Sequence, residues 1–388
     1  MRTLLRDRDR LPPGGTAMNR RDFSTALGAF GALASAPVLV HAAAADSTVG
    51  PAARALYSRA LILDCNCSPP YDELPLPPSA LDLVRNSGIS VVKTSIGGIN
   101  ADFAGAVGEI AQLMQLIELY PAYFTQVRVA ADMARAKREN KLGIIFSFES
   151  AEMLNGKLTS LTVFRDLGVR VMQLSYNRKS PFAAGVMEPD GGGLTPLGRD
   201  AVREMNRLGI AVDLSHANPA TTSDVLNLAS KPPVMTHAGC AALHAHPRLK
   251  TDDQLRALVA RGGVVGIFDL PYLTASPHQP TVDDYVAHLV HALKIAGEDH
   301  VGIGSDAGIA PFDTSPAGMA EFAKDIETRR KQGLSAPEED RPPFVVGLNT
   351  PRRIEIIADQ LLKHGYSAVV TEKIVGGNFA RVFTEIWG

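Results

Sequence analysis

The stretch AVDLSHANPATTSDVLNLASKPPVMTHAGC, residues 211–240, gives the clearest indication of the fold of this chain. It contains two short apolar runs that each finish on a histidine, His216 and His237, with a polar helix-forming segment between them. Two successive strands joined by a helix are typical of a parallel sheet, and this arrangement brings both strand ends to the same rim. We therefore expect the two imidazoles to lie close together where the loops gather.

Two interpretations of this histidine pair fit the stretch when it is taken alone. Neutral imidazole is a common protein ligand for zinc, so two imidazoles at one rim suit a metal ion. The alternative is that both side chains only hydrogen-bond to the backbone of the loops. The choice between these interpretations depends on the residues elsewhere in the chain.

Working outward from this stretch, short apolar runs alternate with amphipathic segments over most of the sequence. The runs that read as strands cover residues 60–66, 89–96, 143–149, 170–176, 211–216, 234–237, 263–269 and 301–306. The segments that read as helices include residues 103–120, 158–167, 196–208, 219–229, 252–260, 282–296, 350–363 and 371–383. About eight strands alternating with helices favour a closed (β/α)8 barrel, a TIM-like α/β fold, over an open doubly wound sheet.

The composition is that of an ordinary globular protein. Of the 388 residues, 45% are apolar and 21% are charged, and the formal net charge is −2. This balance gives no electrostatic footprint for nucleic acid or for an anionic membrane surface. The 3 cysteines cannot build a disulfide framework, so burial has to stabilise the fold.

Residues 1–45 read as a twin-arginine export signal and leader. Arg20 and Arg21 precede a weakly apolar run, residues 24–40, and the small-residue stretch Ala42–Ala45, where we expect cleavage. The apolar run is rich in alanine and glycine, so we expect no permanent membrane span. The alternative is an ordinary disordered tail. On the export interpretation, residues 46–388 form a single domain that reaches the periplasm.

Polar side chains stand at the ends of several predicted strands, and the ones that carry chemistry are Glu149, Tyr176, His216, His237 and Asp306. In a parallel barrel these ends share one rim, which is where such folds build their active sites. Two carboxylates and two imidazoles at one rim fit a hydrolytic metal site. The rest of the chain therefore favours the metal interpretation of the histidine pair.

Several segments together resemble the membrane (renal-type) dipeptidases, the zinc-dependent M19 peptidases with an amidohydrolase-like barrel. These segments are GGGLTPLGRDAVREMNR at residues 191–207, VDLSH at 212–216, HPR at 246–248, VGIGSD at 301–306 and GGNF at 376–379. The resemblance covers residues from about 60 to 388. It implies a metal-dependent hydrolase that acts on dipeptides.

The resemblance also implies a role for each matching residue. Glu149 matches the carboxylate that bridges two zinc ions, and His216 and His237 match the imidazoles that complete one of the two sites. Asp306 matches the carboxylate that binds the other metal and handles the proton of the attacking water. Arg248 matches the arginine that holds the terminal carboxylate of the substrate, a task that suits a planar guanidinium.

The first predicted strand departs from the family pattern. Family members have Asp-Gly-His-Asn-Asp there, and this chain has Asp64-Cys65-Asn66-Cys67-Ser68. The histidine and the second aspartate, which bind the second metal in the family, are replaced by Asn66 and Ser68, whose amide and hydroxyl groups are poor zinc ligands. Cys65 and Cys67 are alternative thiolate ligands, but strand alternation places them on the face opposite Asn66. We therefore expect both cysteines to be small buried core residues. We expect any second metal ion to be held weakly.

Tyr176 is a second departure, because it replaces the histidine that contacts the region of the scissile carbonyl in the family. Its hydroxyl can still donate to an oxyanion, or its ring packs at the rim.

The resulting hypothesis is a zinc-dependent hydrolase, with one or two zinc ions, that cleaves a dipeptide or a similar small amide bearing a carboxylate. The alternatives are a catalytically silent barrel that binds a peptide-like ligand or assists another exported enzyme, and a deacylase or lactonase. Homodimers are common among members of the family, so a homodimer is one expectation for this chain.

Overall fold

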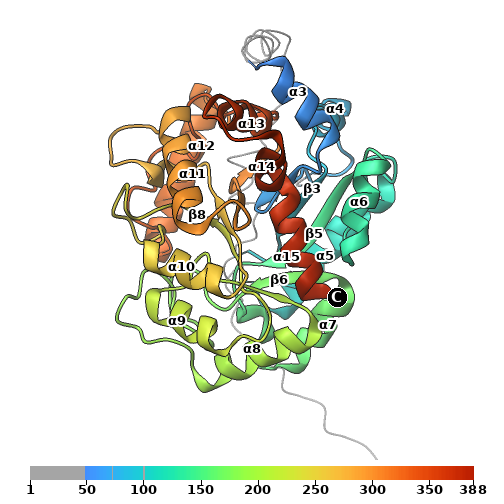
Figure 1. The fold of residues 1–388 in the computed structure, drawn as a ribbon. Coiled ribbons are helices and arrows are strands. Elements are labelled where there is room, and N and C mark those ends of the chain that lie inside the picture. The colour runs from blue at the N-terminus through green and yellow to red at the C-terminus, as the bar shows by residue number, and fades with distance from the viewer. Residues whose placement is uncertain (1–48, 72, 99–100) are drawn as a thin grey trace, which may run out of the picture.

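The computed structural model describes residues 49–71, 73–98 and 101–388 (Figure 1). The export leader predicted for residues 1–45 lies outside the described residues and stays a prediction. Within the described ranges, no helix combines the length and the apolar character that crossing a membrane requires.

Eight parallel strands form the wall of a barrel in the described part of the chain. They are β1 (Leu63–Asp64), β3 (Val91–Ser95), β5 (Leu142–Phe148), β6 (Val169–Gln173), β7 (Ala211–Asp213), β8 (Met235–Ala238), β9 (Val265–Ile267) and β10 (Val301–Ile303). The β7–β8 seam is joined by a hydrogen bond of 3.0 Å from Val234 N to Val212 O. The β10–β1 seam is joined by one of 2.9 Å from Cys65 N to Ile303 O. The predicted (β/α)8 barrel is confirmed.

Helices surround this wall in Figure 1. They are α3 (Pro51–Arg59), α4 (Pro78–Ser87), α5 (Phe103–Leu119), α6 (Ala130–Arg138), α7 (Thr159–Leu167), α8 (Pro196–Leu208), α9 (Pro219–Leu228), α10 (Asp252–Ala260), α11 (Val282–Ala296), α12 (Pro316–Gln332), α13 (Arg353–Lys363), α14 (Ala368–Glu372) and α15 (Asn378–Trp387). Short 3-10 or π turns cover Glu152–Leu154, Pro271–Leu273 and Lys373–Gly377. At the rim, β2 (Cys67–Ser68) pairs with β11 (Ala307–Gly308).

The boundaries of α8 show how the sequence fixes a helix here. Thr195 Oγ1 accepts a hydrogen bond of 3.0 Å from Gly198 N, which satisfies one of the free amides of the first turn. Pro196 follows at the first helical position, where its missing amide hydrogen costs nothing. Gly209 ends the helix with φ 67°, a left-handed conformation that glycine adopts without strain.

One end of the barrel is closed by apolar packing. Val91 and Ile145 on the inner faces of their strands lie in one buried cluster with Phe379 and Phe383 of α15. Gly302 leaves the room for this helix, because a Cβ atom there would lie 2.6 Å from the ring of Phe379. Ligands therefore enter from the opposite end, where the carboxyl ends of the strands lie.

The structure corrects three predicted strand ends. Tyr176, His216 and Asp306 each lie three residues beyond their strands, since β6 ends at Gln173, β7 at Asp213 and β10 at Ile303. The β6 ladder stops at Gln173 because its neighbour β7 ends at the paired residue, Asp213. Asp306 follows in a loop, where its backbone has the left-handed φ of 59°.

A short strand and the helix after it escaped prediction. The strand β4 (Phe124–Gln126) pairs with residues 142–144 of β5, and α6 follows it. β6 pairs with β5 only from Phe146 onward, so β4 occupies the place beside the first half of β5.

Candidate metal centre and substrate pocket

The two histidines meet at the open end of the barrel. His237 lies within β8 and His216 lies three residues beyond β7, and their Nε2 atoms are 3.1 Å apart. Burial lowers the pKa of both imidazoles well below 6.5, so both are neutral at pH 7. A cation bound between the two facing nitrogens would attract the lone pairs of both.

The other ring nitrogen of each histidine is fixed by a hydrogen bond. His216 Nδ1 lies 2.8 Å from Asn177 Oδ1, which can only accept, so this nitrogen carries the proton. His237 Nδ1 lies 2.9 Å from Thr236 Oγ1, and that hydroxyl donates to Asp213 Oδ2 at 2.6 Å. Both Nε2 lone pairs therefore face the centre, which is the arrangement that outer partners impose on metal-binding histidines.

Glu149 completes a group of three ligands. It follows β5 directly, and one of its oxygens lies with one nitrogen each of His216 and His237 inside a set whose atoms are all within 4.8 Å of one another. Ser95 Oγ donates to Glu149 Oε1 at 2.8 Å and orients the carboxylate. Two neutral imidazoles and one carboxylate are a donor set that suits zinc and leaves a coordination position for water.

Asp306 lies beside this group. Its Oδ2 is 4.0 Å from His237 Nε2, and about 20% of its side chain is exposed. The backbone amide of Asp306 donates to Asn66 O at 2.7 Å, which holds the loop against β1. The carboxylate therefore stands where it can reach a water molecule bound among the three ligands.

The strand-one residues present a hydrogen-bond donor to the two carboxylates. Asn66 Nδ2 donates to Glu149 Oε1 at 3.0 Å and to Asp306 Oδ1 at 2.6 Å, so a hydrogen-bond donor occupies the space between the two carboxylates. Cys65 packs in the apolar cluster inside the barrel and Cys67 in the cluster outside it. Burial raises the pKa of both thiols well above 9.0, which keeps them protonated.

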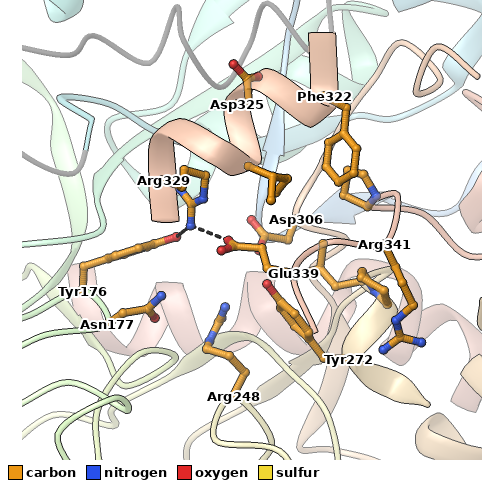
Figure 2. Close-up of a pocket in the computed structure, with 14 residues that line it drawn as sticks. Tyr176, Asn177, Arg248, Tyr272, Asp306, Phe322, Asp325, Arg329, Glu339 and Arg341 are labelled. Atoms are coloured by element: carbon orange, nitrogen blue, oxygen red, sulfur yellow. Dashed lines mark hydrogen bonds and ion pairs between the residues drawn. The ribbon is translucent and has the colours of Figure 1, made fainter. Parts of the chain in front are cut away.

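Arg248 points into the open end of the barrel near Asp306 (Figure 2). The residue is 3% exposed, and its Nε and one Nη have no hydrogen-bond partner among the described residues. Burying a guanidinium without partners is costly, so this side chain is suited to an anion that enters the pocket.

Comparisons with known proteins show the family of the chain. The family model of the membrane dipeptidases, peptidase family M19, matches residues 92–327. The chain belongs to the membrane dipeptidase family. A curated relative, the dipeptidase tcpJ of Claviceps purpurea, is 31% identical over 281 residues, which cover 72% of this chain and 59% of that protein. The chain thus spans about three fifths of the length of that relative.

Solved structures resemble this family member over nearly its whole described length. An amidohydrolase from Pseudomonas aeruginosa has a TM-score of 0.77 and 27% identity, and the match covers 87% of this chain and 99% of that one. A metallopeptidase from Rhodobacter sphaeroides, described as liganded with a phosphinate mimic of the dipeptide L-Ala-D-Ala, has a TM-score of 0.67 and 21% identity, with 84% and 99% coverage. The second likeness shows the fold alone.

The pocket of this dipeptidase-family chain is open to solvent, and Tyr176, Arg248 and Asp306 are among the residues that line it. Helix α12 and the segment after it cover one side, and Figure 2 shows Phe322 and Arg329 projecting from that helix toward the pocket. Apolar side chains line part of its wall, namely Leu270, Pro271, Phe322, Ile326 and Pro343. The pocket thus combines a buried cation with an apolar surface.

Tyr176 connects the metal centre to this cover. Its ring stacks on His216 with ring centroids 4.1 Å apart. Its hydroxyl accepts a hydrogen bond of 3.4 Å from Arg329, which also forms an ion pair with Glu339 (Figure 2). Because Arg329 donates to the oxygen, the hydroxyl hydrogen of Tyr176 remains available for an acceptor in the pocket.

Sequence reasoning selected Glu149, His216, His237, Asp306, Arg248 and Tyr176, and the structure brings all of them to one rim. It missed the groups that orient the histidines, Asn177, Thr236 and Asp213. Two of these had a signal, since Thr236 directly precedes His237 and Asp213 lies in the VDLSH segment that ends with His216. Arg329 and Glu339 had none, because they come from a polar segment without a recognisable motif.

Proposed function

We propose that the chain is a zinc-dependent hydrolase that cleaves the amide bond of a dipeptide or a similar small substrate with a free carboxylate. The observation that carries the proposal is the buried pair of neutral imidazoles whose Nε2 atoms face each other at 3.1 Å beside Glu149. Facing lone pairs of this kind are expected where a metal ion binds. Membership of the dipeptidase family supports the substrate class.

The residues of the chain divide the chemistry among them. Zinc, when bound by Glu149, His216 and His237, supplies Lewis-acid activation of a water molecule. Asp306 accepts the proton of the attacking water and returns it to the leaving amine. Arg248 holds the substrate carboxylate. Tyr176 donates its hydroxyl hydrogen toward the developing negative charge on the scissile carbonyl oxygen.

The test combines metal analysis of the purified chain with a dipeptide hydrolysis assay, and Glu149→Gln is the control variant. We expect bound zinc and turnover in the native chain and loss of both in the variant. A chain that binds dipeptides without turnover in excess zinc or manganese would instead be a ligand-binding protein. A panel of N-acyl amino acids and lactones separates the peptidase from a deacylase or lactonase.

Arg248→Met tests the assignment of the substrate carboxylate. Truncating one partner of a buried charge pair costs about 2–5 kcal/mol, so kcat/KM for a free dipeptide should fall on the order of a hundredfold. The same variant should lose much less on a dipeptide amide, which lacks the carboxylate. An equal loss on both substrates would contradict the role.

We also propose that the chain is exported by the twin-arginine route and works in the periplasm, as the Arg20-Arg21 pair suggests. Replacing both arginines with lysine should keep the uncleaved protein in the cytoplasm. A homodimer is a further expectation, which light scattering of the purified protein tests.

A further inference from the structure

We propose that the centre holds a single metal ion and that a hydrogen-bonded network of Asn66, Ser95 and Lys93 takes the place of a second cation. The inference rests on the proposed function, because it assumes that a metal binds at Glu149, His216 and His237. It goes further by giving roles to Lys93 and Ser95, which belong to neither ligand set.

The amide of Asn66 fills the space that a second cation would need. Its Nδ2 carries two hydrogens, and the two carboxylates of Glu149 and Asp306 accept at 3.0 and 2.6 Å. A zinc ion held by the same two oxygens would lie about 2.0–2.2 Å from each of them, in the space where this nitrogen already sits. The amide and a second metal therefore exclude each other.

Asn66 is fixed in this position from several sides. The residue is 2% exposed, and its side-chain oxygen lies 3.3 Å from Ser95 Oγ. Its backbone carbonyl accepts from Asp306 N at 2.7 Å, and its backbone amide donates to Asp64 Oδ1 at 3.3 Å. Moving the amide out of the centre would break several buried hydrogen bonds at once, which makes the exclusion a property of the folded chain.

Lys93 supplies a positive charge close to Glu149. It is completely buried on β3, and its Nζ donates to Ser95 Oγ at 3.2 Å. Ser95 in turn donates to Glu149 Oε1 at 2.8 Å, so one hydroxyl links the ammonium to the carboxylate. A lysine is retained in a barrel interior only where nearby negative charge offsets the cost of burial, and Glu149 is the carboxylate that this link reaches.

The single-metal proposal also changes the charge of the centre. Relative to the family pattern, this chain lacks one carboxylate at Ser68 and, on this proposal, one divalent cation. Losing both lowers the charge of the centre by one. On this proposal, the buried ammonium of Lys93 supplies one compensating positive charge.

The decisive measurement is the metal content of the full-length chain after equilibration with excess zinc, removal of free metal and elemental analysis. We expect one zinc ion per native chain. The double variant Asn66→His/Ser68→Asp should bind close to two, because it restores the imidazole and carboxylate of the family pattern and removes the amide. Ser68→Asp alone is the matched control and should stay at one, since Asn66 still fills the space.

Lys93→Met tests the ammonium separately, by competition for zinc against a chelator. Removing a buried positive charge near the metal should tighten zinc binding about tenfold or more. A purely structural lysine would leave the affinity unchanged or lower it, and either result would overturn its assigned role.

The outcomes for the native chain separate the two proposals. Two zinc ions per native chain would refute the single-metal centre and leave the hydrolase proposal intact. One zinc ion without turnover on any peptide or amide would refute the hydrolase proposal and leave the single-metal centre intact. No bound metal would refute both.

Discussion

The two sides of this metal centre are built in different ways. The histidine side, formed by Glu149, His216 and His237, has three ligands within 4.8 Å of one another, and their outer partners fix their orientation. The strand-one side, formed by Asn66 and Ser68, presents an amide donor where the family has ligands. On the single-metal proposal, this barrel rim keeps the ligands of one metal ion, and hydrogen bonds replace the ligands of the other. The comparison teaches that each strand end has to be judged separately.

The largest expected effect is the loss of a ligand on the histidine side. His237→Asn should remove the metal and, with it, several kcal/mol of transition-state stabilisation, about a thousandfold or more in kcat/KM. Metal analysis and the hydrolysis assay check both parts. Asn66→Ala is the contrasting variant on the strand-one side and should retain one metal ion. If the two variants lose metal equally, the distinction between the sides fails.

Asp306→Asn separates proton transfer from metal binding. The amide keeps the shape of the side chain and cannot accept the proton of water, so kcat should fall about 10²- to 10⁴-fold. The zinc content should remain near that of the native chain, because the three ligands of the histidine side are intact. Loss of zinc in this variant would make Asp306 a required ligand and would move it to the metal-binding set.

Asp213→Asn tests whether the outer partners matter on the histidine side. Its carboxylate holds Thr236, which orients His237, and losing such a partner typically weakens metal affinity about 10- to 100-fold. Chelator competition measures the change. An affinity equal to that of the native chain would show that the packing around His237 fixes its ring without the hydrogen-bond chain.

The smallest expected effect is on the pH dependence of folding stability, through the buried residue His288. Burial lowers the pKa of His288 from 6.5 to about 4, so between these values the unfolded chain binds a proton that the folded chain does not. Folding stability should therefore fall as the pH drops from 7 to 5, by about 2 kcal/mol from this residue alone.

Denaturant unfolding of the metal-free protein at both pH values measures this contribution. His288→Gln should lower the overall stability, because His288 Nδ1 accepts from Cys240 N at 3.0 Å. The variant should nevertheless show a smaller difference between pH 7 and pH 5. An unchanged difference would contradict the assignment.

The barrel and most of its rim could be predicted from the sequence, because buried parallel strands are continuous apolar runs and the candidate ligands lie at or just beyond the carboxyl ends of these strands. The short strand β4 escaped prediction since Phe124–Gln126 is too brief and too polar to read as a strand. The bonds of Arg329 to Tyr176 and Glu339 escaped it because tertiary packing alone creates them.

Lys93 is a different case, because the sequence does contain a signal for its role. Within the run ISVVKTSI, residues 89–96, alternation places Val91, Lys93 and Ser95 on one face of the strand. A lysine on the inner face of a barrel strand needs compensating charge, so its presence predicts a polar cluster nearby. The acceptor, Glu149, comes from another strand and is identified only by the fold.

The backbone of Asp306 has a consequence for protein engineering. At φ 59° the backbone of this residue carries about 1 kcal/mol of strain, which glycine at this position would not have. A selection for heat resistance alone should therefore tolerate or favour glycine at this position and discard the carboxylate with it. Stabilised variants of this chain need to be screened for turnover at every round, because the most thermally resistant candidates are expected to include inactive ones.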